Sequence, residues 1–225
     1  MEMDFTRLSA FINSFDTDAD PVLSRIETEA IRNEVPIIRH EMIRFLQVLL
    51  QLKKPEHILE VGCATGFSAM VMASFTEPSC RITTIEQDQE RIREAKKHFH
   101  ENGLEDRITL LEGDAMQLLG QLAEDQKGCY DFVFLDAAKA QYIHFLPLLK
   151  ELMAPEAVLV SDNVLQEGDL CESRYLVRRR DRTIYKRMRE YLYALTHDDE
   201  LITSIIPIGD GVTVSIKRIE KNKPE

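Results

Sequence analysis

The sequence predicts an α/β fold in which helices cover both faces of a mostly parallel sheet. From residue 57 onward, short apolar segments bounded by turn residues alternate with amphipathic segments of helical period. The last two apolar segments break this alternation, because only a short link containing Gly-Asp-Gly separates them. The length of 225 residues, 44% of them hydrophobic, suits one domain of ordinary size. We therefore expect a single domain over residues 1–225, with helices in 1–55 and the sheet in 56–225.

Three helices are expected before the sheet begins. Apolar residues recur at three- and four-residue spacing over Asp4–Phe15, Pro21–Asn33 and Arg39–Leu52. Pro21 and Pro36 stand at the breaks between these segments, where proline commonly starts or interrupts a helix. The N-terminal part is therefore expected to be helical throughout.

Seven strands are expected, each a short apolar run between turn residues. They are Ile58–Val61, Arg81–Glu86, Ile108–Glu112, Phe132–Leu135, Val158–Ser161, Leu201–Ile206 and Val212–Lys217. Four helices alternate with the first five strands, over Phe67–Phe75, Gln89–Asn102, Ala115–Glu124 and Gln141–Met153. The last two strands, joined through Pro207–Gly211, are expected to form an antiparallel hairpin at one edge of the sheet.

The composition favours a reducing compartment and no membrane segment. The cysteines form no CxxC pair, which argues against a zinc site and against a disulfide framework. The N-terminal segment carries acids where a signal peptide carries lysines, and no apolar run approaches the roughly 18 residues that span a membrane. We therefore expect a cytoplasmic protein.

One segment reverses the charge of an otherwise acidic chain. The formal net charge is −11, yet residues 174–189 hold eight basic residues and one acid, or +7 against −18 for the remainder. Such a segment predicts an anionic partner, with nucleic acid as the leading candidate. The arginines expected to contact it are Arg174, Arg178, Arg179, Arg180 and Arg182. The alternative is an amphipathic helix whose arginines pair with acids of the same protein.

The first strand runs into a glycine turn that predicts a nucleotide-like cofactor. Gly62 and Gly66 allow close approach of the backbone to a ligand at the carboxyl end of this strand, where ligands bind in open α/β sheets. Ala64 and Phe67 break the GxGxxG pattern, so a pyrophosphate is not expected. Glu86 ends the second strand, where a carboxylate can accept hydrogen bonds from both hydroxyls of a ribose.

The third strand adds a further candidate contact to this cofactor. Gly113-Asp114-Ala115 follows it, and a carboxylate and an N–H group there could meet an adenine edge. An adenosine cofactor is therefore expected. The alternative is that the glycines make only a tight turn and that Glu86 is a surface acid.

Oxygen-bearing side chains follow the fourth and fifth strands. Asp136 ends the fourth strand, and Asp162 and Asn163 end the fifth. Adjacent parallel strands lie about 4.8 Å apart, so these three side chains can converge on one ion. Oxygen ligands without His or Cys select Mg²⁺ or a similar hard cation and leave positions for water or substrate. The alternative is that each residue is a turn former or a helix cap.

Lys139 stands three residues after Asp136, close to where such a metal would hold an acceptor. A substrate with a hydroxyl beside a second oxygen could chelate the metal. Lys139 is then a candidate general base for that hydroxyl. The alternative is a solvated lysine without a catalytic role.

Taken together, these motifs resemble the cation-dependent class I S-adenosylmethionine (SAM) O-methyltransferases, the family of catechol and caffeoyl-CoA methyltransferases. The resemblance covers nearly the whole chain. Its motifs are the N-terminal helices, the EVGxxxGxS-like turn, the acid Glu86, Asp-Ala-Ala-Lys, Asp-Asn and Pro-Ile-Gly-Asp-Gly. It implies a seven-stranded, Rossmann-like class I methyltransferase fold and a homodimer.

The resemblance also implies roles for individual residues. Lys139 and Asp136 would be catalytic, and Asp136, Asp162 and Asn163 would hold Mg²⁺ or Mn²⁺. The residues around the methionine and adenosine parts of SAM would be Glu60, Gly62, Gly66, Ser68, Glu86, Asp114, Ala115 and Asp136.

The arginine-rich segment resembles that of bacterial tRNA 5-hydroxyuridine methyltransferases, which make 5-methoxyuridine at the wobble position. The resemblance therefore implies a tRNA anticodon loop as the substrate, and the 5-hydroxyl and 4-carbonyl of uracil offer an oxygen pair much as a catechol does. One alternative is an O-methyltransferase of catechol-like or caffeoyl-CoA-like small molecules. Another is a catalytically silent RNA-binding protein, against which the presence of Asp136, Lys139, Asp162 and Asn163 speaks.

Overall fold

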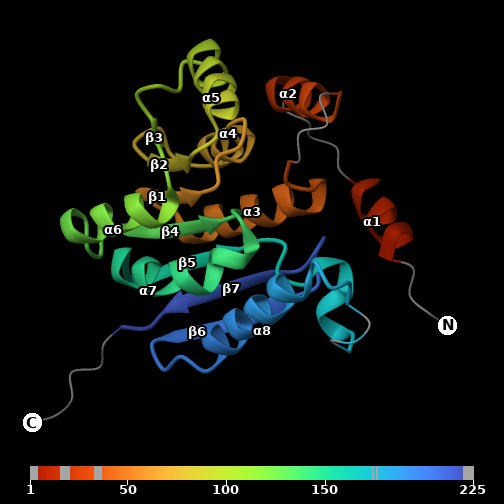
Figure 1. The fold of residues 1–225 in the computed structure, drawn as a ribbon. Helices are drawn as coiled ribbons and strands as arrows, with labels where there is room; N and C mark the ends of the chain where they lie inside the picture. Colours follow the sequence, from red (N-terminus) through yellow and green to blue (C-terminus); the bar gives the residue numbers. More distant parts are fainter. Residues whose placement is uncertain (1–4, 16–20, 33–36, 174, 176, 220–225) are drawn as a thin grey trace, which may run out of the picture.

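The computed structural model describes residues 5–15, 21–32, 37–173, 175 and 177–219. Its centre is a seven-stranded sheet in the order β3-β2-β1-β4-β5-β7-β6 (Figure 1). The strands are β1 His57–Val61, β2 Arg81–Glu86, β3 Ile108–Glu112, β4 Tyr130–Leu135, β5 Met153–Ser161, β6 Leu201–Ile206 and β7 Val212–Lys217. The first five strands are parallel, and β7 runs antiparallel to both β5 and β6. The predicted sheet and its edge hairpin are confirmed.

Helices cover both faces of this sheet (Figure 1). They are α1 Phe5–Asn13, α2 Pro21–Arg32, α3 His40–Lys53, α4 Phe67–Ser74, α5 Gln89–Glu101, α6 Ala115–Asp125, α7 Tyr142–Leu152 and α8 Arg182–Thr196. Two short 3₁₀ helices, η1 Lys139–Gln141 and η2 Gln166–Cys171, follow the ends of β4 and β5. Asp4 and Asn33 at the ends of predicted helices, and Pro36 at a predicted break, lie outside the described residues.

Alternation along the strands produces two separate hydrophobic cores. Successive side chains of a strand point to opposite faces, so Phe132 and Phe134 of β4 enter one core while Val133 and Leu135 enter the other. The first core is closed by residues of α2, α3, α4 and α5, and the second by residues of α6, α7 and α8. Between the two layers of helices, the side chains of β1 and β4 are almost all buried, which explains why these two strands are mostly apolar.

The main differences between the structure and the sequence prediction concern β5 and α8. β5 begins at Met153 and not at Val158. Met153 pairs with Tyr130 of β4, and after a register irregularity the pairing continues from Phe132 with Val158. α8 was expected only as the alternative interpretation of the basic segment. Its buried face consists of Tyr185, Met188, Tyr191 and Leu195. No helix among the residues shown in colour in Figure 1 has the length and apolar character that crossing a membrane would need.

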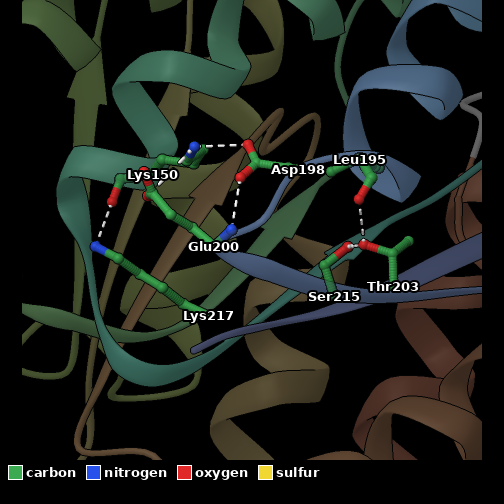
Figure 2. Close-up of polar contacts among 7 residues, drawn as sticks. All are labelled: Lys150, Leu195, Asp198, Glu200, Thr203, Ser215 and Lys217. Carbon is green, nitrogen blue, oxygen red and sulfur yellow. Dashed lines mark hydrogen bonds and ion pairs between the residues drawn. The ribbon is translucent and has the colours of Figure 1, made fainter. Parts of the chain in front are cut away.

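A polar cluster ties the hairpin to α7 and α8 at the end of the sheet where β5 begins (Figure 2). Lys217 Nζ donates hydrogen bonds to the backbone oxygens of Lys150 at 2.7 Å and Met153 at 2.8 Å, which caps the C-terminus of α7. Lys150 Nζ lies 2.6 Å from a carboxylate oxygen of Asp198 and 3.2 Å from one of Glu200. These contacts hold β6 and β7 in place at the edge of the sheet.

We expect Lys217→Met to lower the free energy of unfolding by about 1–3 kcal/mol, because it removes a charged donor from two partly buried carbonyls. Urea unfolding followed by circular dichroism measures this difference. The neighbouring exposed Arg218→Met is the control and should change stability by no more than about 0.5 kcal/mol. Equal stabilities of the two variants would show that the Lys217 cap contributes nothing.

Candidate active site

A cavity of about 690 Å³ opens at the carboxyl ends of β1 to β5. Its lining includes the turns that follow these strands, the residues just before α3 and the link between β6 and β7. Most of the predicted cofactor residues line it, namely Gly62, Ser68, Glu86, Asp114, Ala115 and Asp136. Glu60 and Gly66 are not among its lining residues.

The glycine turn after β1 needs its two glycines for different reasons. Gly62 has φ +102°, and a Cβ atom there would lie 2.1 Å from the carbonyl oxygen of Asp136. Gly66 has φ +86°, and its Cβ would lie 2.6 Å from the ring of Phe99 on α5. Any side chain at Gly62 would push the turn away from the end of β4. The turn therefore joins the cofactor side of the cavity to the side that carries Asp136.

Glu86 is buried at the end of β2 and orders the backbone around it. Its Oε2 accepts a hydrogen bond from the Ala64 N–H at 2.9 Å, and its Oε1 accepts from the N–H groups of Gln87 and Asp88 at 2.8 and 3.0 Å. A carboxylate oxygen accepts more than one hydrogen bond, so Glu86 keeps capacity for the hydroxyls of a ribose. Its predicted role is compatible with this geometry and stays a prediction.

Asp114 has a structural role in addition to the one predicted from the sequence. It is the N-cap of α6, where its Oδ1 accepts a hydrogen bond from the Gln117 N–H at 3.1 Å. With Gly113 and Ala115 it lines the cavity at the end of β3. One side chain thus both starts the helix and borders the cavity.

Glu60 is a fully buried carboxylate on β1. Thr84 of the neighbouring strand β2 donates a hydrogen bond to its Oε2, while its Oε1 has no hydrogen-bond partner among the described residues. Burial raises the pKa of Glu60 to about 7. The hydrogen bonding of a buried carboxyl group with one unpartnered oxygen can change when a ligand binds nearby.

Asp136 and Asp162 stand together at the tips of β4 and β5. The Asp162 N–H donates to the backbone oxygen of Leu135 at 3.0 Å, and Asn163 Nδ2 donates to Asp136 Oδ1 at 3.1 Å. Burial raises the pKa of Asp136, and burial together with the nearby charge of Asp136 raises the pKa of Asp162 to about 7. All three residues line the same cavity, and their convergence on one ion stays a prediction.

The donor set fits a hard cation. Two buried carboxylates repel each other when both are ionised, and a bound cation would offset that cost. A half-turn of the Asn163 amide would present its oxygen where its nitrogen now contacts Asp136. Within residues 5–219, apart from the undescribed positions, no three His, Cys, Asp or Glu side chains gather as a metal site. The predicted set differs because its third member is an amide.

Lys139 begins η1 and lines the cavity beside Asp136 and Asp162. Arg187 of α8 donates a hydrogen bond from Nη1 to the backbone oxygen of Ala140 at 3.0 Å. This bond fixes η1, and with it the backbone that carries Lys139, against α8.

An ion pair at the cavity was missed by the sequence analysis. Arg39, just before α3, pairs with Asp210 in the link between β6 and β7, and both residues line the cavity. The two positions are 171 residues apart in the sequence. Asp210 belongs to the Pro-Ile-Gly-Asp-Gly motif, but Arg39 belongs to no motif, so the sequence gives no sign that the two residues meet.

The basic segment divides into anchored and exposed arginines. Arg182 donates to the Val177 backbone oxygen at 3.2 Å, and Arg189 donates to the Leu170 backbone oxygen at 2.9 Å. Arg178, Arg179 and Arg180 are exposed, and Arg180 lies 3.5 Å from Asp181. Arg174 lies outside the described residues. None of the described arginines of this segment lines the cavity.

The tyrosines of this segment divide in the same way. Tyr185 and Tyr191 are buried in the second core, as expected for an amphipathic helix. Tyr175 is 88% exposed, and its ring is therefore accessible to a partner.

Comparisons with known proteins agree with this architecture. A family model described as O-methyltransferase matches residues 14–218. A catechol O-methyltransferase of Niastella koreensis is 33% identical over 129 residues, 57% of this chain and 58% of that protein. Caffeoyl-CoA O-methyltransferase 2 of Populus trichocarpa is 30% identical over 174 residues, 76% of this chain and 70% of that protein.

A solved structure supports the class I methyltransferase fold. The O-methyltransferase of Bacillus cereus in complex with SAH has a TM-score of 0.83 and 20% sequence identity to this chain. The match covers 94% of this chain and 97% of the other. The predicted fold class is confirmed.

We expect Glu60→Gln to stabilise the ligand-free protein more at pH 8 than at pH 4.5. Because the folded pKa is raised from 4.5 to about 7, ionisation favours the unfolded chain as the pH rises through this window. Between pH 4.5 and pH 8, the free energy of unfolding of the wild type should fall by up to about 3 kcal/mol relative to that of the variant. Urea unfolding at both pH values measures this difference, with the exposed Glu124→Gln as control. A difference between variant and wild type that is independent of pH would contradict the assignment.

Proposed function

The chain belongs to the O-methyltransferase family, and from this premise we propose that it transfers the methyl group of SAM to an oxygen atom of an acceptor. The relative from Bacillus cereus was solved with SAH, which is SAM after loss of that methyl group. In this chain, the cavity lined by the glycine turn and Glu86 supports binding of an adenosine-containing methyl donor.

We propose that Asp136, Asp162 and Asn163 hold a divalent cation of the Mg²⁺ class at the acceptor end of the cavity. The buried pair of carboxylates is the observation that supports this site, since a cation offsets their mutual repulsion. Such a cation, when bound, supplies positive charge that orients an acceptor hydroxyl and lowers its pKa.

The chain's own residues then account for the remaining chemistry. The acceptor oxygen attacks the methyl carbon in line with the breaking carbon–sulfur bond, and the sulfonium becomes a neutral thioether. The hydroxyl proton passes to Nζ of Lys139, which acts as the general base and borders the same part of the cavity. Apolar side chains of Ile37, Ile38, Met42 and Phe145 also line the cavity.

We propose that the acceptor is 5-hydroxyuridine in the anticodon loop of a tRNA. The exposed Arg178 and Arg179 carry this proposal, because neither forms an ion pair with a described residue. They precede α8. This helix starts at the same end of the sheet at which β4 and β5 end and β7 starts (Figure 1). Arginines there can neutralise phosphates of a loop whose base enters the cavity.

A catechol-like small molecule is the second candidate acceptor. Two named relatives favour it, a catechol methyltransferase and a caffeoyl-CoA methyltransferase. It needs the same cation and Lys139 but makes no use of the exposed arginines. The homodimer implied by the resemblance stays a prediction under either acceptor.

The combined substitution of Arg178, Arg179 and Arg180 by Ala separates these acceptors. With a tRNA carrying 5-hydroxyuridine, we expect methylation to fall at least tenfold at about 0.15 M salt, and its salt dependence to weaken by a logarithmic slope of about 2–3. Nucleoside mass analysis measures the 5-methoxyuridine that is formed. Turnover of a neutral catechol should stay unchanged, because screening of phosphates does not affect it.

The matched control replaces three exposed basic residues of α5, Arg93, Lys96 and Lys97, by Ala. It removes the same charge far from the start of α8 and should leave tRNA methylation within about twofold. If the arginine variant methylates tRNA as fast as the wild type, the tRNA proposal is wrong. If the wild type methylates only the catechol, the small-molecule acceptor replaces it.

A further inference from the structure

Tyr142 connects the two strand tips that carry the proposed cation ligands. It is the first residue of α7 and is fully buried. Its hydroxyl lies 3.2 Å from the backbone oxygen of Leu135 and 3.2 Å from that of Asp162. Leu135 immediately precedes Asp136. One buried hydroxyl thus contacts the backbone of Asp162 and the backbone of the residue that precedes Asp136.

This contact continues the sheet at the point where its own hydrogen bonds stop. The paired register of β4 and β5 ends at Leu135 and Ser161, and the Asp162 N–H adds a hydrogen bond to the Leu135 oxygen at 3.0 Å. Carbonyl groups cannot donate, so the single proton of the tyrosine hydroxyl is shared between both oxygens. The ends of β4 and β5 are thus both bound to the side chain of Tyr142.

The ring of Tyr142 is itself held in place. It packs edge-on against Tyr191 of α8, with ring centroids 5.4 Å apart and an interplanar angle of 76°. The Tyr191 hydroxyl is hydrogen-bonded to the Ser161 hydroxyl at 2.6 Å, and Ser161 is the last residue of β5. Tyr142 therefore contacts the backbone at both strand ends, Tyr191 contacts the side chain of the residue before Asp162, and neither tyrosine lines the cavity.

We propose that Tyr142 is a positioning residue that sets the spacing of Asp136 and Asp162 and thereby the affinity of this site for a divalent cation. The proposal rests on the proposed function, because it requires that these acids bind a cation. Groups behind metal ligands typically change metal affinity by about 10- to 100-fold when they are removed. A purely structural role would lower stability without changing cation affinity relative to other buried tyrosines.

The experiment compares Tyr142→Phe with Tyr130→Phe in the full chain. Tyr130 begins β4 at the opposite end of the sheet, is buried, and donates its hydroxyl to Gln126 Oε1 at 2.6 Å. Both changes delete one hydroxyl and keep the ring, so the two variants suffer comparable losses of packing and hydrogen bonding. We expect each to lower the melting temperature by about 2–4 °C.

Binding of Mn²⁺ alone is measured by electron paramagnetic resonance on protein without substrate. Tyr142→Phe should raise the Mn²⁺ Kd at least tenfold, whereas Tyr130→Phe should leave it within about twofold. The Kd of SAM, measured by calorimetry, should stay within about twofold in both variants, because neither hydroxyl contacts the cofactor side of the cavity.

Two results would overturn the proposal in distinguishable ways. An unchanged Mn²⁺ Kd in Tyr142→Phe, with tight binding by the wild type, removes the positioning role and leaves the cation site intact. A wild type that does not bind Mn²⁺ removes the proposed cation site, and the role of Tyr142 with it. Equal weakening in both tyrosine variants would show that general destabilisation, and not the spacing of the tips, controls the affinity.

Discussion

The juxtaposition of Asp136 and Asp162 at neighbouring strand tips is the constraint on which the rest of the site depends. Parallel pairing of β4 with β5 brings the two carboxylates to the same edge, and burial makes it costly to ionise both. Lys139 borders them on the same side of the cavity, and the Asn163 amide donates a hydrogen bond to Asp136. A divalent cation is the simplest partner that would offset the remaining charge.

The glycine turn relates this acidic centre to the cofactor side of the cavity. Because Gly62 packs directly on the Asp136 carbonyl, the turn after β1 and the tip of β4 form a continuous wall. Glu86 holds the same turn through the Ala64 N–H. A methyl donor bound along this wall would therefore meet the acceptor at Asp136, which is the arrangement that in-line transfer needs.

Much of the fold and the chemical residues of the site could be predicted from the sequence, because buried strands are apolar runs and ligands gather at their carboxyl ends. The rest depends on long-range packing. α8 was hidden by its many arginines, since only one narrow face of it is apolar. Arg39 and Asp210 meet across 171 positions. No motif marks Tyr142, because the sequence does not show which carbonyls its hydroxyl reaches.

The most direct test of the acidic centre is methyl transfer by protein freed of metal with a chelator and then dialysed. The cation site predicts that transfer stops while SAM still binds, and that added Mg²⁺ or Mn²⁺ restores the full rate. Transfer at full rate without any divalent cation would contradict it, and would mean that Asp136, Asp162 and Asn163 have another purpose.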